Sequence, residues 1–219
     1  MKGVRASAAP FVFSAVELRG IYAILDPTAT DDPLAFLEAV LDGGVRLVQY
    51  RAKAGVERAL VRRLHARTQA RGALLIVNDD LDAALDADGL HAGQEDLQRL
   101  DAATLRVRLG RRVLGISCGL PGEARAAQAL GADYVGTGPF APTASKSDAG
   151  EAIGALGLRA VVAATTLPVA AIGGIELADL ELVGACGARM AAVISALARG
   201  PDVQANARAL VERWNAVNA

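Results

Sequence analysis

Short apolar segments alternate with longer amphipathic segments from residue 20 to the end of the chain. The apolar segments are five or six residues long, short enough for strands and too short for a typical helix. They therefore predict eight strands. The predicted strands cover residues 20–25, 46–50, 73–77, 88–92, 112–117, 133–138, 168–173 and 190–195.

The segments between these strands are rich in Ala, Leu and Arg, with apolar residues three and four positions apart. This spacing places apolar side chains on one face of a helix, and glycine, which follows several of the segments, is common where helices end. The pattern predicts a helix after each strand. The predicted helices lie within residues 31–44, 55–72, 79–87, 98–110, 121–132, 153–165, 175–188 and 201–217.

The alternation of strands and helices indicates a parallel sheet covered by helices. Eight pairs close naturally into a barrel, so we predict the α/β class and a single-domain (β/α)8 TIM barrel over residues 20–219. An open doubly wound sheet is the rival architecture, but no G-x-G-x-x-G motif follows the first predicted strand. Residues 1–19 are predicted to be an N-terminal extension.

The composition agrees with one soluble domain. The chain has 219 residues, of which 53% are hydrophobic, enough for one substantial core. Its 23 Lys and Arg nearly balance its 24 Asp and Glu, so no general field would attract nucleic acid or an anionic membrane. No apolar run reaches the ~18 residues of a transmembrane helix. We therefore expect neither nucleic acid nor a membrane as a partner.

Cysteine usage and the N-terminal sequence bear on location. Cys118 and Cys186 lie far apart, without metal-ligand spacing or a disulfide framework, which suits a reducing cytoplasm. Lys2 and Arg5 precede a stretch that faintly imitates a signal peptide, but Pro10 interrupts it and no convincing cleavage site follows. We predict a cytoplasmic protein.

Candidate functional residues follow from the barrel prediction, because the chemistry of such barrels collects where strands end and the next loops begin. Polar residues and glycines occur at nearly every predicted strand end. They are Gln49, Arg51, Lys53, Asn78, Asp79, His91, Gln94, Asp96, Ser117, the segment 136–146, Gly173, Gly174 and Ser195.

The residues after the second and third strands each allow two interpretations. Gln49, Arg51 and Lys53 alternate, so they could converge on one anion or form a solvated strand end. Asp80 or a neighbour is expected to cap the next helix, which leaves Asp79 available for a ligand.

His91 and Ser117, each taken alone, are weak evidence for a catalytic site. His91 lies in a strand-like run, where a histidine is more often a hydrogen-bonded packing residue than a ligand, so it is not counted as catalytic. Ser117 has no accompanying base with the logic of a catalytic triad.

The segment 136–146 is stronger evidence, because it combines glycines and prolines with Thr143, Ser145 and Lys146. Hydroxyl, backbone N–H and ammonium donors hold phosphates in loops of this type, although a plain turn-rich connection is the alternative. Glycines after the seventh strand and Ser195 after the eighth lie where barrels often bind a phosphate. Together these features predict a pocket for two anionic groups.

Asp79 and Asp96 follow neighbouring predicted strands and explain how a diphosphate could be held. Mg²⁺ is commonly bound by one or two carboxylates together with phosphate oxygens of the substrate. The alternative, an acid and base pair for glycoside hydrolysis, would leave Arg51, Lys53 and Lys146 without a role. We therefore favour diphosphate chemistry with Mg²⁺.

Seven segments carry a resemblance to a known family: QYRAK (49–53), VNDD (77–80), ADGLHAGQED (87–96), LGIS (114–117), GADYVGTGPFAPTASK (131–146), AIGGI (171–175) and AVIS (192–195). In this order and at these spacings they closely resemble the thiamine phosphate synthase family. The resemblance covers roughly residues 20–215. It implies a transferase that joins 4-amino-2-methyl-5-(diphosphooxymethyl)pyrimidine to a thiazole ethyl phosphate and releases pyrophosphate.

The resemblance also assigns roles to the motif residues. It implies that the pyrimidine diphosphate is bound by Gln49, Tyr50, Arg51, Ala52, Lys53, Asn78, Ser117 and Lys146. It implies that Mg²⁺ is held by Asp79 and Asp96, and the thiazole phosphate by Thr143, Ala144, Ser145, Gly174, Ile194 and Ser195. Arg51, Lys53, Ser117 and Lys146 are the implied catalytic residues.

The mechanism implied by the resemblance is dissociative: the diphosphate leaves first, and the thiazole nitrogen captures the resulting pyrimidine-methyl cation.

The sequence departs from the family at Ser145, where Thr is usual, and at Gly119, where relatives commonly carry His. Two other functions stay open, a thiazole tautomerase on the same barrel and a non-catalytic phosphate-binding barrel. Gly119 argues against the tautomerase, which depends on a histidine after the fifth strand. The expected partners are small-molecule substrates, and a homo-oligomer stays open.

Overall fold

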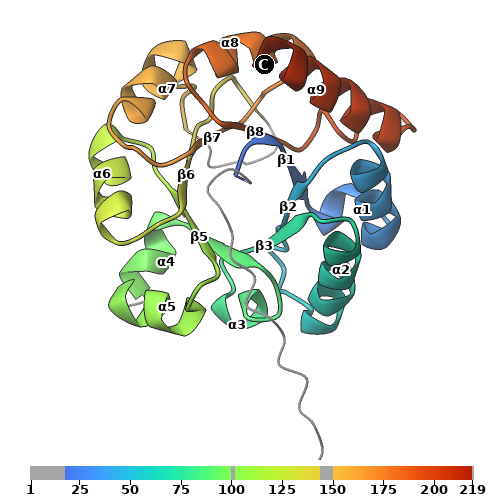
Figure 1. Ribbon diagram of the computed structural model, residues 1–219, viewed down its shortest axis with the longest axis horizontal. Coiled ribbons are helices and arrows are strands. Elements are labelled where there is room, and N and C mark those ends of the chain that lie inside the picture. Colours follow the sequence, from blue (N-terminus) through green and yellow to red (C-terminus); the bar gives the residue numbers. More distant parts are fainter. Residues whose placement is uncertain (1–17, 100–101, 144–149, 219) are drawn as a thin grey trace, which may run out of the picture.

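The structure, a computed structural model, describes residues 18–99, 102–143 and 150–218. Within these residues, eight parallel strands form a closed barrel in sequence order, and β1 pairs with both β2 and β8 (Figure 1). The strands are β1 Gly20–Leu25, β2 Leu47–Tyr50, β3 Leu74–Asn78, β4 Gly89–Ala92, β5 Val113–Ser117, β6 Tyr134–Thr137, β7 Val169–Ile172 and β8 Met190–Val193. The predicted (β/α)8 barrel is confirmed.

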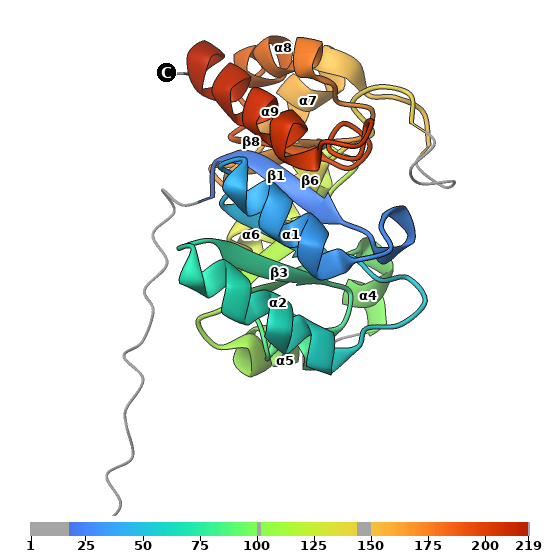
Figure 2. The ribbon, with the colours of Figure 1, turned by 90° about the vertical axis from the view of Figure 1, so that its right-hand side faces the viewer.

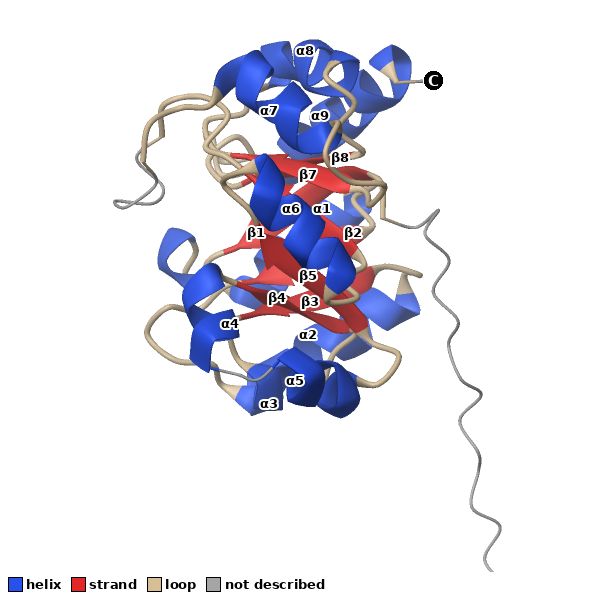
Figure 3. Cartoon of the chain, turned by 90° about the vertical axis from the view of Figure 1, so that its left-hand side faces the viewer, coloured by secondary structure: helices blue, strands red, loops and turns tan. Residues whose placement is uncertain are grey.

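Helices form an outer ring around the strands, as Figures 1 and 3 show. The α-helices are α1 Pro33–Asp42, α2 Arg58–Ala70, α3 Leu81–Ala84, α4 Gln94–Arg99, α5 Ala102–Leu109, α6 Pro121–Ala129, α7 Gly154–Val162, α8 Leu180–Ala185 and α9 Val203–Val217. Two short 3-10 helices, η2 Pro27–Ala29 and η3 Leu177–Asp179, precede α1 and α8.

The ends of the outer ring meet where α9 packs beside α1 (Figure 2). Asp32 caps α1 by accepting from the backbone N–H groups of Leu34 and Ala35. Gly43, directly after α1, lies so close to α9 that an added Cβ would come within 2.5 Å of Ala207 Cβ. The absence of a side chain at this position therefore allows the last helix to close against the first.

The apolar side chains form two separate clusters, as the alternation of side chains along each strand requires. The smaller cluster fills the barrel interior and contains Tyr22, Ile76, Tyr134 and Met190 among others. The larger cluster lies between the strands and the helices. Since the interior is filled, the open end of the barrel is left to form a binding site.

The predicted strands agree with the structure to within one or two residues, but the helices differ in three places. The helix predicted within 98–110 contains α5, Ala102–Leu109, but α4 begins earlier, at Gln94, where no helix was predicted. The helix predicted over 79–87 is only the four-residue α3, and that over 175–188 is divided into η3 and α8.

No helix among the described residues is long and apolar enough to span a membrane. Residues 1–17 of the predicted extension lie outside the described residues, and its separation from the barrel stays a prediction.

Candidate active site

A cavity of about 590 Å³ opens at the carboxyl ends of the strands. Figure 2 shows the loops that follow β1 and β6 projecting from the same end of the barrel. This size is typical of sites for small molecules. Most of the predicted site residues line the cavity: Gln49, Arg51, Lys53, Asn78, Asp79, Ser117, Thr143, Gly174, Ile194 and Ser195.

Of the remaining predicted site residues, two do not line the cavity, and the side chains of the other four are not described. The Tyr50 side chain is buried in the larger cluster between strands and helices, and Ala52 packs against that cluster, so neither side chain lines the cavity. Asp96 lies in α4, in the turn that follows Gly93, but its side chain is not among those described. The predicted residues Ala144, Ser145 and Lys146 lie outside the described residues.

Arg51 is oriented by a partner that the sequence motifs do not include. Its Nη1 donates to Asp26 Oδ2 over 2.9 Å, and both side chains are largely buried, with 12% and 14% exposed. Asp26 is itself fixed, because its other oxygen accepts from the backbone N–H and the hydroxyl of Thr28. The guanidinium is therefore held at the wall of the cavity by the loop after β1.

Asp79 occupies a tight turn at the end of β3. Its φ of +63° lies in the left-handed region, and the N–H of Asp80 bonds to the carbonyl of Asn78 over 2.8 Å. A three-residue turn of this kind is strained for a residue with a side chain. The N–H of Asp79 donates to the carbonyl of His91 on β4, which holds the turn in place. Asn78 Nδ2 donates to Asp79 Oδ2, so the amide and the carboxylate lie together at the cavity wall.

Asp80, the residue after Asp79, caps the next helix, as the sequence predicted. Asp80 caps α3, with Oδ1 accepting from the N–H of Ala83 over 2.8 Å. The prediction that Asp80 caps the helix is therefore confirmed, and Asp79 faces the cavity instead.

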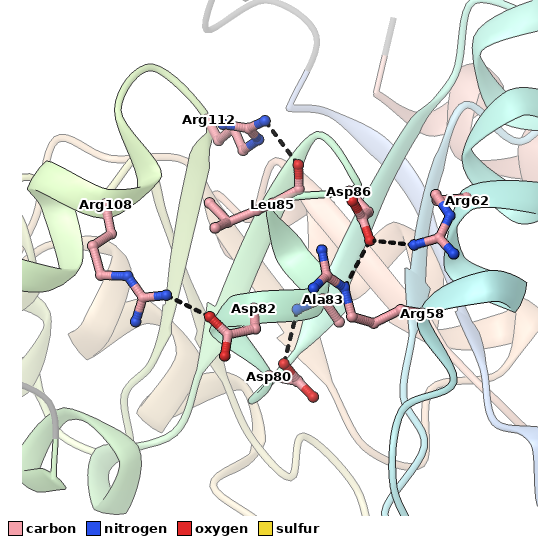
Figure 4. Close-up of polar contacts among 9 residues, drawn as sticks. All are labelled: Arg58, Arg62, Asp80, Asp82, Ala83, Leu85, Asp86, Arg108 and Arg112. Carbon is pink, nitrogen blue, oxygen red and sulfur yellow. Dashed lines mark hydrogen bonds and ion pairs between the residues drawn. The ribbon is translucent and has the colours of Figure 1, made fainter.

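Arginines from two helices hold the short connection that contains α3 (Figure 4). Arg58 and Arg62 of α2 both donate to Asp86 Oδ2, over 2.8 and 3.0 Å, and the Arg58 hydrogen bond lowers the pKa of that carboxyl. Arg108 of α5 pairs with Asp82 on the other side. Since Asp79 immediately precedes this connection, the arginines fix the segment from which it projects.

Ser117 at the end of β5 contacts a buried histidine. His91 Nε2 lies 2.9 Å from Ser117 Oγ, and His91 Nδ1 lies 2.9 Å from Tyr134 Oη. Burial lowers the pKa of His91 to about 4, so the ring is neutral at physiological pH. His91 thus contacts Ser117, but its other partner is a phenol rather than a carboxylate, so no base with the arrangement of a catalytic triad accompanies the serine, as the sequence predicted. His91 is the hydrogen-bonded packing residue that the sequence predicted.

The other side of the cavity is formed by backbone at the ends of β6 and β7. Gly174 has a φ of +65°, and an added Cβ would come within 2.7 Å of two carbonyl oxygens in the loop after β6. Only glycine fits this conformation and this close approach. The loop of Thr143 is thereby brought against the ends of β7 and β8, where Ile194 and Ser195 also line the cavity.

Several lining residues were missed by the sequence prediction. Tyr22, Cys118 and Glu95 line the cavity, and Asp26 supports it through Arg51. Tyr22 lies within an apolar run that predicts only a strand, so no local pattern distinguishes it. Burial, together with the nearby Glu123 carboxylate, raises the pKa of Cys118 to about 12, so its thiol is a poor nucleophile.

The arrangement therefore gathers cations, an amide and a carboxylate at the ends of β2 and β3, and glycine and hydroxyl groups at the ends of β7 and β8. The first group suits a charged phosphate ester with a metal ion, and the second suits a smaller anion. Neither Cys118, whose pKa is raised, nor Ser117, whose histidine lacks a carboxylate partner, has the features of an activated nucleophile.

Comparisons with known proteins agree with this geometry. A family model described as thiamine monophosphate synthase matches residues 21–197. The thiamine-phosphate synthase of Geobacillus kaustophilus is 43% identical over 206 residues, which cover 90% of this chain and 92% of that protein. The thiamine-phosphate synthase of Moorella thermoacetica is 45% identical over 185 residues, which cover 82% and 87%.

A solved structure gives the same result at the level of the fold. Thiamine phosphate pyrophosphorylase from Pyrococcus furiosus matches with a TM-score of 0.82 and 30% sequence identity, over 93% of this chain and 98% of that one. The resemblance drawn from the sequence motifs is therefore confirmed. The chain belongs to the thiamine monophosphate synthase family, whose members are transferases of thiamine biosynthesis.

Proposed function

We propose that this protein joins 4-amino-2-methyl-5-(diphosphooxymethyl)pyrimidine to thiazole ethyl phosphate, forming thiamine phosphate and pyrophosphate. The observation that carries the proposal is that one cavity is lined both by cations at the ends of β2 and β3 and by glycine and hydroxyl groups at the ends of β7 and β8. Arg51, Lys53 and Asn78 line one side, and Gly174 and Ser195 line the other. A reaction between two phosphorylated molecules needs both sides, and a single cavity supplies the proximity that such a condensation requires.

The diphosphate is assigned to the side formed by β2 and β3. Arg51 and Lys53 provide positive charge there, and the Arg51 guanidinium is already oriented by Asp26. Lys146, from the loop after β6, is assigned to the same diphosphate by its motif. An oriented guanidinium loses less side-chain entropy when it binds an anion, which favours both affinity and transition-state stabilisation.

Asp79 and Asp96 are assigned to Mg²⁺. The described donor set fits this ion, because Asp79 presents a carboxylate to the cavity that Arg51 and Lys53 also line, and Mg²⁺ is commonly bound by one or two carboxylates together with phosphate oxygens. Mg²⁺ bound there would neutralise charge on the diphosphate. The strained turn and the arginine contacts around α3 fix Asp79 for this role.

The proposed reaction begins with departure of the diphosphate from the pyrimidine methyl group. Arg51, Lys53 and Lys146 stabilise the negative charge that develops on the leaving group. Ser117 and Gln49 hold the pyrimidine end of the substrate in the barrel mouth. The thiazole nitrogen then forms a bond to the pyrimidine-methyl cation, so no covalent intermediate with the enzyme is formed.

The thiazole phosphate is assigned to the opposite side. Thr143, Ala144 and Ser145 belong to the loop after β6, and Gly174, Ile194 and Ser195 follow β7 and β8. Backbone N–H groups near glycine and the hydroxyl groups suit a phosphate monoester. Binding there would place the thiazole ring across the cavity from the diphosphate.

The direct test mixes the purified protein with both substrates and Mg²⁺ and measures thiamine phosphate after oxidation to fluorescent thiochrome. We expect product that disappears when EDTA removes the metal. Folded protein that gives no product would contradict the proposal. Isomerisation of the thiazole phosphate alone would support the tautomerase, and ligand binding without any turnover would support a non-catalytic barrel.

Two substitutions test the proposed leaving-group site. Arg51→Ala and Lys146→Ala are each expected to lower kcat about 100-fold or more while the fold, checked by circular dichroism, stays intact. Arg67→Ala is the matched control, because Arg67 pairs with Glu38 on the outer helices, away from the cavity. Rates near wild type for both site variants would contradict the assignment.

A further inference from the structure

A continuous chain of hydrogen bonds runs through the barrel interior and ends at Ser117. Gln49 Nε2 donates to Tyr22 Oη over 2.9 Å, and Tyr22 Oη lies 2.8 Å from Tyr134 Oη. Tyr134 Oη lies 2.9 Å from His91 Nδ1, and His91 Nε2 lies 2.9 Å from Ser117 Oγ. Five strands contribute one member each: β2, β1, β6, β4 and β5.

Two glycines make room for the middle of this chain. Gly115 pairs with His91 on one side and with Tyr134 on the other, so the three residues lie side by side on adjacent strands. An added Cβ at Gly115 would come within 2.1 Å of the Tyr134 ring, and one at Gly136 within 3.0 Å of His91 Cε1. Because Gly115 has no side chain, the tyrosine and histidine meet across β5.

The direction of the hydrogen bonds follows from their first member. A side-chain amide nitrogen can only donate, so Tyr22 Oη accepts from Gln49. Tyr22 is 1% exposed, and its remaining described partner is Tyr134, so its hydroxyl hydrogen must point to Tyr134. The opposite direction at this step would leave that hydrogen unpaired in the barrel interior, which is unfavourable.

The same reasoning continues to the pocket. Tyr134 Oη accepts from Tyr22, and its own hydrogen is directed to His91 Nδ1. An imidazole that accepts at Nδ1 carries its hydrogen on Nε2 when neutral, so Nε2 donates to Ser117 Oγ. The Ser117 hydroxyl hydrogen is then directed away from His91, toward the cavity that Ser117 lines.

We propose that Tyr22, Tyr134 and His91 are positioning residues whose aligned hydrogen bonds make the Ser117 hydroxyl a donor to the substrate. The acceptor is a ring nitrogen or a diphosphate oxygen of the pyrimidine substrate, and this part rests on the proposed function of the cavity. A reversed chain would present Ser117 as an acceptor and would repel either atom. The direction in which the Ser117 hydroxyl donates is thus set by Gln49, at the other end of this series of hydrogen bonds.

The tautomer of His91 is the direct measurement, and it needs no enzyme activity. In ¹⁵N-histidine-labelled full-length protein, the nitrogen chemical shifts distinguish Nε2–H, Nδ1–H and protonated rings. His65, which pairs with Asp88 on the outer layer, is the other histidine, and His65→Asn identifies its signals. We expect the Nε2–H tautomer for His91 in the wild type and a mixture of tautomers in Tyr22→Phe. An Nδ1–H or protonated ring in the wild type would overturn the proposal.

A double-mutant cycle tests whether Tyr22 acts through Ser117. Tyr22→Phe is expected to lower kcat/KM about tenfold in the wild-type background, the effect of weakening one hydrogen bond to the substrate. In the Ser117→Ala background the same change is expected to have almost no further effect. Equal losses in both backgrounds would show that Tyr22 acts through packing and would overturn the proposal.

Thr137→Val is the matched control for removal of a buried hydroxyl. Thr137 Oγ1 is buried and has no hydrogen-bond partner in the described structure. Thr137 follows Tyr134 by three positions on β6, so its side chain faces the helices rather than the barrel interior. The control is expected to keep wild-type kcat/KM and the wild-type His91 tautomer. A comparable loss of kcat/KM in Thr137→Val would show that the response to Tyr22→Phe is not specific to the hydrogen-bond chain, which would also overturn the proposal.

Discussion

The orientation of Arg51 depends on Asp26, which contributes no atom to the cavity lining. Asp26→Asn keeps an oxygen that can accept from Thr28 but removes the negative charge opposite Arg51. We expect the KM for the pyrimidine diphosphate to rise about tenfold, as when one charge-assisted hydrogen bond is lost. Steady-state kinetics with varied pyrimidine substrate would measure this.

The control for this change is Asp32→Asn, at the cap of α1, because Asp32 also accepts from backbone N–H groups but does not line the cavity. Its KM should stay near wild type. If Asp26→Asn leaves the KM unchanged, Arg51 is oriented by something other than its ion pair.

Gly115 is a second single residue on which the site depends. In Gly115→Ala the added methyl group would lie 2.1 Å from the Tyr134 ring, so the ring must move. We expect the free energy of unfolding to fall by about 1–3 kcal/mol, the usual range for overpacking a core. Urea denaturation measures this. Gly122→Ala in α6, where an added Cβ meets nothing within 4 Å, should not be destabilised, and equal losses in the two variants would contradict the explanation.

At the scale of elements, the connection between β3 and β4 decides where Asp79 lies. Its helix has only four residues, too few to be stable alone, so external contacts must hold it. Figure 4 shows those contacts coming from α2, from α5 and from Arg112, which precedes β5 and donates to the carbonyl of Leu85. Exposed ion pairs of this kind contribute little to overall stability, but they can still fix a local geometry.

The double variant Arg58→Gln with Arg62→Gln removes the contacts to Asp86. We expect the Mg²⁺ concentration for half-maximal activity to rise only about two- to fivefold, since exposed ion pairs hold a segment weakly. Titration of activity with Mg²⁺ measures the change.

The matched control is Arg67→Gln with Arg71→Gln. Arg67 lies on the same helix and Arg71 directly follows it, but they pair with Glu38 and Asp42. Removing them should leave the Mg²⁺ dependence unchanged. A similar shift in both double variants would mean that α2 acts through general stability rather than through the segment after Asp79.

The same elements show which parts of the structure the sequence could predict. Short apolar runs located all eight strands, because a buried parallel strand must be apolar along its whole length. Helix boundaries after β3 and β4 were harder, since α3 and α4 have only four and six residues, too few for a repeating apolar pattern to define where each helix begins and ends. The site residues were located by motif and by strand ends, whereas Tyr22 and Asp26 depend on partners 112 and 25 positions away.

At the scale of the whole molecule, the barrel interior combines an apolar cluster with a line of polar groups that reaches the cavity. Buried polar groups of this kind are favourable only when every member is paired, and the chain from Gln49 to Ser117 meets that condition. Burial also raises the pKa values of Tyr22 and Tyr134, so both phenols stay neutral. The interior therefore tolerates polar groups but not a charge.

That intolerance predicts how the stability of the whole protein depends on pH. Burial lowers the pKa of His91 from 6.5 to about 4, so the unfolded chain binds a proton in this range that the folded protein does not. The free energy of unfolding should therefore fall as the pH falls from 6.5, by about 3 kcal/mol at pH 4. His91→Gln lacks this group, and the difference between the two proteins isolates its contribution from that of the carboxylates. Urea denaturation of both at several values between pH 7 and pH 4 measures it. Parallel curves for wild type and His91→Gln would show that the histidine is not held neutral in the folded barrel.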